Sequence, residues 1–256
     1  MEKKIEIIYQ DADILAINKP AGLLVHPTHI SKEKTLTDWL LGKFPEIKTV
    51  GDDPENRPGI VHRLDKETSG VMIIARHQKA FEYLKKLFQT RQIKKTYLAL
   101  VWGRVAQHSG IIEKPLGLKT GSLKRTTRIE GAKMVKEAKT LYRVKKYVVL
   151  RPPPRRGRQA QDNKVPGTLL EVEPLTGRTH QIRVHLASIG HPVVGDTLYS
   201  KKRAPAGIER MFLHAESIEL TLPNGSRTKI EADLPRTLKT FLEIKLGDNS
   251  ELDSLQ

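Results

Sequence analysis

Two clusters of polar residues stand at the edges of apolar segments, where they could do chemistry. The first, residues 62–70, contains Asp65 and directly precedes the apolar run 71–75. The second, residues 176–183, ends at Arg183. Polar groups are costly to bury beside such segments unless they are paired. A carboxylate at Asp65 and a guanidinium at Arg183 could form an ion pair that only stabilises the fold, or a charged centre that acts on a substrate; both interpretations are open at this point.

Several other kinds of site are excluded by what the sequence lacks. It contains no cysteine, which excludes disulfides, thiolate nucleophiles and cysteine-bound zinc. It has no glycine-rich phosphate loop ending in Lys-Ser/Thr and no GxSxG nucleophile elbow. Its nine histidines form no HExxH pattern, so we expect no metal site. We expect His26, His191 and His214 to be hydrogen-bonded structural histidines.

The elements that must position these clusters are a mixture of short strands and helices. The run 71–75 has no apolar alternation and is typical of a strand buried on both faces, as is 96–102. Amphipathic spacing predicts helices at 78–89 and 179–189. A further helix is predicted at 35–44. Extended segments are predicted at 5–9, 14–17, 23–25, 110–118, 138–150 and 168–172. The remaining segments that complete the fold are 211–220, 227–232 and 238–244. Strands outnumber helices without strict alternation, which predicts an α+β fold with a mixed, largely antiparallel central sheet.

The charge of the chain indicates a polyanionic partner. Lysine and arginine number 45 against 29 acidic residues, a net charge of +16 that attracts RNA, DNA or anionic lipid. A merely soluble basic surface is the alternative. Positive charge is concentrated at residues 119–128 and 151–158. The second stretch holds three prolines and four arginines, so we expect an exposed loop there.

The length of the chain suits one large domain or two small ones. We expect a catalytic domain over residues 1–246 and a polar, disordered tail over 247–256. No apolar run is long enough to cross a bilayer, and the charged first residues do not resemble a signal peptide. We therefore expect a cytoplasmic protein that does not enter a membrane. We also expect a monomer, although no feature of the sequence indicates the oligomeric state.

A family resemblance adds to these observations. The segment His62-Arg63-Leu64-Asp65-x-x-Thr68-Ser69-Gly70 resembles the catalytic signature of the RluA/RluD family of RNA pseudouridine synthases. Further segments resemble motifs of the same family, in the family's order, at residues 18–26, 95–103, 177–185 followed by 190–196, and 213–215. Five ordered motifs between residues 5 and about 235 are a specific signal, although any one alone would be weaker.

The resemblance implies the family's α+β fold with flanking helices and an active-site cleft, and a cofactor-free isomerase. Such an enzyme breaks the N1–C1′ bond of a uridine in RNA, turns the uracil and rejoins it through C5. Asp65 matches the catalytic carboxylate, which stabilises positive charge on the sugar or bonds to it. Attack at C1′ and proton removal at C2′ both remain open. Arg183 matches its basic partner, which should keep the carboxylate charged, and Tyr97 matches the tyrosine that stacks on the uracil.

The resemblance also assigns substrate contacts. Arg63 matches the position that fills the space left by the flipped-out base, because a guanidinium stacks on bases as well as bonding to them. A surface phosphate contact is the alternative role for Arg63. Leu213 matches an apolar wall of the pocket, although Leu213 and Tyr97 could each be plain core residues. His62, Arg178 and His180 are expected to contact the substrate through their motif positions.

The expected partner is RNA, with large-subunit ribosomal RNA favoured and transfer RNA as the alternative substrate. Many relatives carry an N-terminal S4 domain, which is not visible here, so the RNA backbone should be held by the two basic stretches. The residues assigned to this contact are Lys124, Arg125, Arg155, Arg156 and Arg158. Two solvated loops are the alternative. The second possible function is that of a non-catalytic RNA-binding or ribosome-assembly factor. The joint presence of Asp65, Tyr97 and Arg183 argues against it. A DNA-binding protein lacks support, since no helix-turn-helix or zinc finger is apparent.

Overall fold

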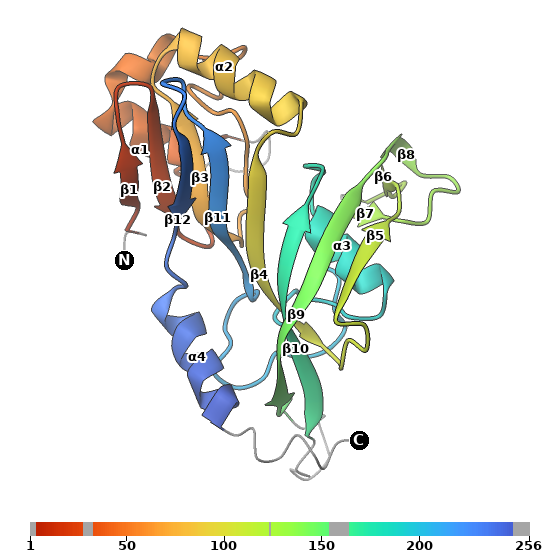
Figure 1. The fold of residues 1–256 in the computed structure, drawn as a ribbon. Helices are drawn as coiled ribbons and strands as arrows, with labels where there is room; N and C mark the ends of the chain where they lie inside the picture. Colours follow the sequence, from red (N-terminus) through yellow and green to blue (C-terminus); the bar gives the residue numbers. More distant parts are fainter. Residues whose placement is uncertain (1–3, 28–32, 123, 154–163, 248–256) are drawn as a thin grey trace. The chain divides into compact units, whose positions relative to one another are not determined.

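The chain folds into two compact units. The computed structural model describes residues 4–27, 33–122, 124–153 and 164–247. Unit 1 comprises residues 1–95 and 215–233, and unit 2 comprises residues 96–214 and 234–256. The chain therefore leaves unit 1 after residue 95, returns to it for residues 215–233 and then passes back into unit 2, a path that the colours of Figure 1 follow. Both units combine helices with largely antiparallel strands, which confirms the predicted α+β class.

Unit 1 is built on a sheet with the strand order β1-β2-β3-β11. Its strands are β1 (Glu6–Gln10), β2 (Ile14–Lys19), β3 (Ser69–Ala75), β11 (Leu213–Thr221) and β12 (Arg227–Glu231), which pairs with β11. All seven residues of β3 are buried, as its uninterrupted apolar run predicts. Gly70 in β3 has φ +118°, and a side chain there would collide with the backbone of Ala215. Only glycine allows this close approach of two strands.

Among the described residues, unit 1 has three helical segments: α1 (Leu36–Lys43), the 3₁₀ helix η1 (Pro45–Thr49) and α2 (Gln78–Gln89). A capping box opens α1, since the Asp38 carboxylate accepts the Thr35 N–H at 2.7 Å and the Thr35 hydroxyl accepts the Asp38 N–H. The predicted extended segment 23–25 forms no strand. Its carbonyls at Leu24 and Val25 instead accept N–H groups from the start of α1. Helix α2 lies against β3 with the buried residues Ala80, Phe81, Leu84 and Leu87.

Unit 2 contains a four-stranded arrangement in the order β4-β10-β9-β5. The strands are β4 (Lys94–Trp102), β10 (Val165–Pro174), β9 (Lys139–Leu150) and β5 (Ser109–Glu113). The single strand predicted at 110–118 is wrong. Pro115 lacks the N–H that a strand interior needs, and the chain breaks into β5 and β6 (Leu116–Leu118).

Strand β6 is the centre of a second, three-stranded sheet, whose other strands are β7 (Arg125–Thr126) and β8 (Lys133–Lys136). We call residues 116–136 the basic sheet. Part of the predicted basic loop 119–128 is therefore a strand, because Arg125 and Thr126 pair with Leu118 and Gly117. The predicted loop 151–158 is described only as far as residue 153.

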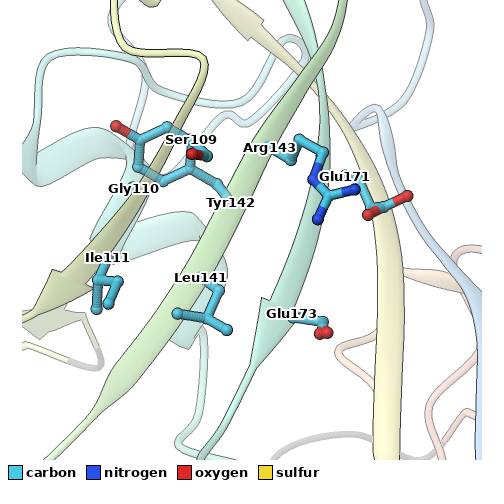
Figure 2. A pocket seen from close by; sticks show the side chains of 8 residues that line it. All are labelled: Ser109, Gly110, Ile111, Leu141, Tyr142, Arg143, Glu171 and Glu173. Atoms are coloured by element: carbon cyan, nitrogen blue, oxygen red, sulfur yellow. The ribbon is translucent and has the colours of Figure 1, made fainter.

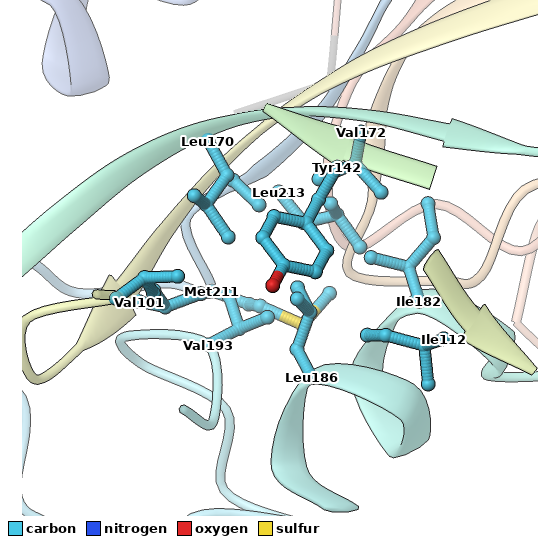
Figure 3. Close-up of a cluster of buried hydrophobic side chains, with 12 residues drawn as sticks. Val101, Ile112, Tyr142, Leu170, Val172, Ile182, Leu186, Val193, Met211 and Leu213 are labelled. Atoms are coloured by element: carbon cyan, nitrogen blue, oxygen red, sulfur yellow. The ribbon is translucent and has the colours of Figure 1, made fainter. Parts of the chain in front are cut away.

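In the part of unit 2 that the structure describes, there are two helices, α3 (Gln181–Ser188) and α4 (Arg236–Gly247). Ile182 and Leu186 of α3 join a buried cluster that contains Val101, Tyr142, Leu170 and Leu213 (Figure 3). Leu238 and Phe241 of α4 join a second cluster around Trp102. Gly247, expected in the tail, is the last residue of α4, and residues 248–256 lie outside the described residues. Within the described residues, no helix combines the length and apolarity that crossing a bilayer requires.

Candidate active site

The predicted site residues divide between the two units. Asp65, Arg63 and His62 lie in unit 1. The others lie in unit 2: Tyr97, Lys124, Arg125, Arg178, His180, Arg183 and Leu213. Arg155, Arg156 and Arg158 lie outside the described residues. Each group is held by its own set of local contacts.

Asp65 occupies a tight turn immediately before β3. Its carbonyl accepts the N–H of Thr68 at 3.1 Å across a two-residue turn at Lys66 and Glu67. Thr68 is buried, whereas Asp65 is half-buried. The turn therefore presents a carboxylate at the edge of a strand that is itself fixed in the core.

A buried lysine supports this turn through hydrogen bonds to backbone carbonyls. Lys19, at the end of β2, is fully buried, and its Nζ donates to the carbonyls of Pro20 and Leu23 at 2.9 Å and of Lys66 at 3.2 Å. The Lys66 carbonyl also accepts the N–H of Gly22 at 2.7 Å. A buried ammonium is tolerated only with such partners. The turn at residues 20–23 and the Asp65 turn are thus bound together by one side chain.

His62 is locked in a neutral state. Its Nε2 accepts the N–H of Ile73 at 2.9 Å, so the ring proton resides on Nδ1. The ring stacks on Phe88 with centroids 4.7 Å apart. Burial, with a smaller contribution from the Lys95 charge, lowers the pKa of His62 to about 3. His62 therefore ties the Asp65 segment to β3 without adding a positive charge.

Arg63 points toward a second neutral histidine. Its Nη1 lies 2.8 Å from Nε2 of His26, whose Nδ1 lies 2.9 Å from the carbonyl of Pro27. The carbonyl can only accept, so Nδ1 of His26 carries the proton and Nε2 accepts from Arg63. Burial lowers the pKa of His26, which keeps this ring uncharged beside the guanidinium. Desolvation lowers the pKa of Arg63 and the Asp65 carboxylate opposes that shift, so these two charged residues interact.

In unit 2, Arg183 pairs with a carboxylate that was not assigned a role from the sequence. Its Nε and Nη2 donate to the two oxygens of Asp196 at 2.7 and 2.9 Å. Asp196 Oδ1 also accepts the N–H groups of Leu198 at 2.9 Å and Tyr199 at 3.1 Å. Burial opposes ionisation of Asp196, but these hydrogen bonds outweigh it and hold the pKa below its usual value. The predicted interaction of Arg183 with Asp65 remains a prediction.

The segment before α3 is fixed by Gln181. Its Oε1 accepts from the Thr176 hydroxyl at 2.6 Å and from the Arg178 N–H at 3.0 Å, and its Nε2 donates to the carbonyl of Lys139. Arg178 also donates from Nε to the carbonyl of Glu137 at 3.0 Å. His180 occupies the N-cap of α3 in the left-handed conformation, with φ 58°. Gln181, which was placed in a motif but given no role, therefore fixes the backbone of Arg178, one of the predicted substrate contacts.

Tyr97 and Leu213 lie at the apolar cluster beside α3. Tyr97 pairs with Val172 across β4 and β10 and is only partly buried, whereas Leu213 is fully part of the core. Partial burial leaves some of the Tyr97 side chain accessible. The location suits either a wall of a pocket or a core role, and the assignment to the uracil site remains a prediction.

The expected structural histidines are hydrogen-bonded where their contacts are described. His26 makes the two contacts given above, and Nδ1 of His191 lies 2.9 Å from the carbonyl of Trp102. His214 is fully buried. Among the described residues, no group of three or more potential metal ligands comes together.

A cavity of about 260 Å³ lies elsewhere in unit 2, on β5, β9 and β10 (Figure 2). Arg143, Glu171 and Glu173 are its charged residues, and none of the predicted site residues lines it. Glu171 is also paired with Lys145 at 3.4 Å. The lining of this cavity therefore includes no described residue with a predicted chemical role.

Comparisons with known proteins agree with the motifs. The family model described as RNA pseudouridylate synthase matches residues 13–188. An uncharacterized RNA pseudouridine synthase of Aquifex aeolicus (strain VF5) is 41% identical over 213 residues, which are 83% of this chain and 61% of that protein. The ribosomal large subunit pseudouridine synthase D of Nitrosomonas europaea is 35% identical over 248 residues, 93% of this chain and 64% of that protein.

A solved structure has the same fold. Human RNA Pseudouridylate Synthase Domain Containing 1 superposes with a TM-score of 0.70 at 25% identity, covering 91% of this chain and 84% of that one. The chain spans a little over six tenths of the length of the two bacterial relatives. The matched residues include Asp65, Tyr97 and Arg183 and extend over both units. The chain belongs to the RNA pseudouridylate synthase family.

Proposed function

We propose that this chain isomerises uridine to pseudouridine in structured RNA, with Asp65 as the catalytic carboxylate. The observation that carries the proposal is the Asp65 turn, in a chain that belongs to this family. Lys19 and Gly22 bind the turn through the Lys66 carbonyl, so the carboxylate is presented from a rigid support. A catalytic group held in this way needs little reorganisation during the reaction, which lowers the activation free energy.

The atoms and electrons of the reaction balance without a cofactor. The N1–C1′ bond breaks, the uracil turns, and a C5–C1′ bond forms; the proton leaves C5 and N1 ends with a proton. Cleavage places positive charge on the sugar, which the Asp65 carboxylate stabilises or captures as a covalent bond. By motif position, Arg183 supplies the positive charge of the site and Tyr97 stacks on the uracil.

The target base must leave its stack before it can react, which costs a few kcal/mol. We assign Arg63 to the space that the base vacates. The hydrogen bond to His26 fixes the direction of the Arg63 guanidinium. Because His26 is neutral, it does not compensate the positive charge of Arg63. A planar guanidinium can then stack on neighbouring bases and bond to their edges. Phosphates are held by the basic sheet and by residues 151–158, as the net charge of +16 supports.

Large-subunit ribosomal RNA is the proposed substrate, because the Nitrosomonas relative is named a ribosomal large subunit pseudouridine synthase. The test is chemical mapping of pseudouridine in all cellular RNA from a strain that lacks this protein, with and without the restored gene. Loss of one or a few sites in large-subunit ribosomal RNA, regained on restoration, supports the proposal. Sites lost only from transfer RNA would move the substrate to that class, and unchanged pseudouridine everywhere would contradict the activity.

A further inference from the structure

Tyr199 lies where the Arg183–Asp196 ion pair meets the basic sheet of unit 2. Its N–H donates to Asp196 Oδ1 at 3.1 Å, so its backbone is part of the environment of that carboxylate. Its half-buried side chain packs against a small cluster formed by Leu116, Ala138 and Val184. One residue is therefore in contact with the basic sheet, with α3 and with the partner of Arg183.

The ring of Tyr199 orients the guanidinium of Arg183. The Arg183 Cζ lies 5.2 Å from the ring centroid, within the range of a cation–π interaction. Asp196 meanwhile binds Nε and Nη2 of the same guanidinium. Arg183 is thus fixed by an ion pair and by an aromatic ring.

The hydroxyl of Tyr199 joins two other segments. It accepts the backbone N–H of Arg125, in β7 of the basic sheet, at 2.9 Å, and lies 2.8 Å from Nδ1 of His180. His180 has φ 58°, a left-handed conformation that is strained for a non-glycine residue and persists only where neighbours hold it. The hydroxyl therefore connects the basic sheet to the strained first residue of α3.

The basic sheet is suited to hold phosphates. Residues 116–136 contain six cations and one acid: Lys119, Lys124, Arg125, Arg128, Lys133 and Lys136, against Glu130. A second contact ties this sheet to the same segment, because Lys124 Nζ donates to the carbonyl of Leu198 at 3.1 Å. The segment 198–199 is consequently the point at which the basic sheet is anchored to the Arg183 environment.

We propose that Tyr199 is a positioning residue that links RNA binding by the basic sheet to the orientation of Arg183, an inference that rests on the proposed function. The hydroxyl and the ring have separable effects. The hydroxyl holds the basic sheet in place and acts on RNA affinity. The ring holds Arg183 and acts on turnover.

Two substitutions separate these effects in the full chain. Tyr199→Phe removes the hydroxyl and keeps the ring, whereas Tyr199→Leu removes both. With a full-length large-subunit ribosomal RNA transcript as the probe, Tyr199→Phe should raise Kd and KM about five- to tenfold, the equivalent of one lost hydrogen bond, with kcat within about twofold of wild type. Tyr199→Leu should weaken binding equally and also lower kcat at least about tenfold.

Tyr147 provides a matched control within the same unit. Its hydroxyl donates to the carbonyl of Val105 at 2.9 Å, and the Arg104 Cζ lies 4.7 Å from its ring centroid. Tyr147→Phe therefore removes a comparable hydroxyl contact beneath an arginine that belongs to no predicted site. This variant should keep the Kd, KM and kcat of wild type.

The measurements have decisive outcomes for Tyr199. A wild-type Kd for Tyr199→Phe, equal kcat losses in both Tyr199 variants, or the same changes in Tyr147→Phe would each overturn the inference. If the wild-type chain binds the transcript but forms no pseudouridine in any cellular RNA, the proposed function fails instead. The Kd comparison still judges the role of the hydroxyl in that case, because it requires no turnover.

Discussion

Arg183 donates two hydrogen bonds to Asp196, at 2.7 and 2.9 Å, and this ion pair is almost completely buried, with side-chain exposures of 9% and 0%. Such a pair is costly to break, because removal of one partner leaves the other charge desolvated and uncompensated. The position of the Arg183 guanidinium thus depends on a residue thirteen positions further along the chain.

Asp196→Asn should therefore lower the free energy of unfolding by about 3 kcal/mol and reduce turnover, since Arg183 loses its charged partner. Denaturant unfolding measures the first effect. The control is Asp52→Asn, which breaks an exposed ion pair with Lys85 and should cost no more than about 1 kcal/mol. Equal losses in the two variants would contradict the importance assigned to the buried pair.

Lys19→Met should destabilise unit 1 and loosen the Asp65 turn. The substitution removes the ammonium donor from the carbonyls of Pro20, Leu23 and Lys66, of which that of Lys66 keeps the Gly22 N–H. One unsatisfied buried polar group costs about 1 to 3 kcal/mol. Hydrogen exchange at the N–H of Thr68, which bonds to the Asp65 carbonyl, reports on the turn directly. Lys48→Met, at an exposed position in η1, should leave both stability and exchange unchanged. Unaltered exchange in Lys19→Met would remove Lys19 from the support of the turn.

His62 should make the protein sensitive to acid. The folded-state pKa of about 3 lies below the ordinary value of 6.5, so between these pH values the unfolded chain binds a proton that the folded chain does not. The His62 contribution to stability is therefore present above pH 6.5 and is lost as the pH falls toward 3. His62→Gln should flatten this dependence by less than about 1.4 kcal/mol per pH unit, because residue 62 is only partly buried.

Unfolding curves between pH 7 and 4 measure this slope. The same substitution at the exposed imidazole of His108 should retain the wild-type slope. A wild-type slope in His62→Gln would mean that His62 is protonated without penalty in the folded state.

Arg63→Ala should discriminate between kinds of RNA. If Arg63 fills the space of an extruded base, the variant should lose kcat/KM on a structured RNA, up to about 100-fold if the loss matches the few kcal/mol of unstacking. A short unpaired oligonucleotide with the same uridine has less stacking to replace, and its kcat/KM should fall much less. Equal losses on both RNAs would favour a plain phosphate contact, the alternative role for Arg63.

Local sequence patterns correctly predicted the helices and strands that are determined by residues close together in the sequence. The uninterrupted apolar run at β3 and the apolar face of α2, with Phe81 and Leu84, lie where periodicity places them. The break at Pro115 was missed, although the missing N–H of proline is visible in the sequence, because the flanking residues are apolar.

The supports of the candidate site were harder to predict because they join distant residues. Lysine is usually a surface residue. The burial of Lys19 is explained only by its hydrogen bond to the Lys66 carbonyl, 47 positions away in the chain. The contact between Arg125 and Tyr199 spans 74 positions, and no local pattern encodes it. Asp196 lies in a segment that resembles a family motif, but only the structure identifies its partner as Arg183.

The proposed function depends above all on the carboxylate of Asp65, to which the chemistry is assigned. Asp65→Asn is nearly isosteric, so the variant should retain its melting temperature and its Kd for the RNA transcript while the single-turnover rate of pseudouridine formation falls at least about 10,000-fold, as expected when the group that stabilises the reacting sugar is lost. Pseudouridine formation by Asp65→Asn at a rate within about tenfold of wild type would contradict the claim.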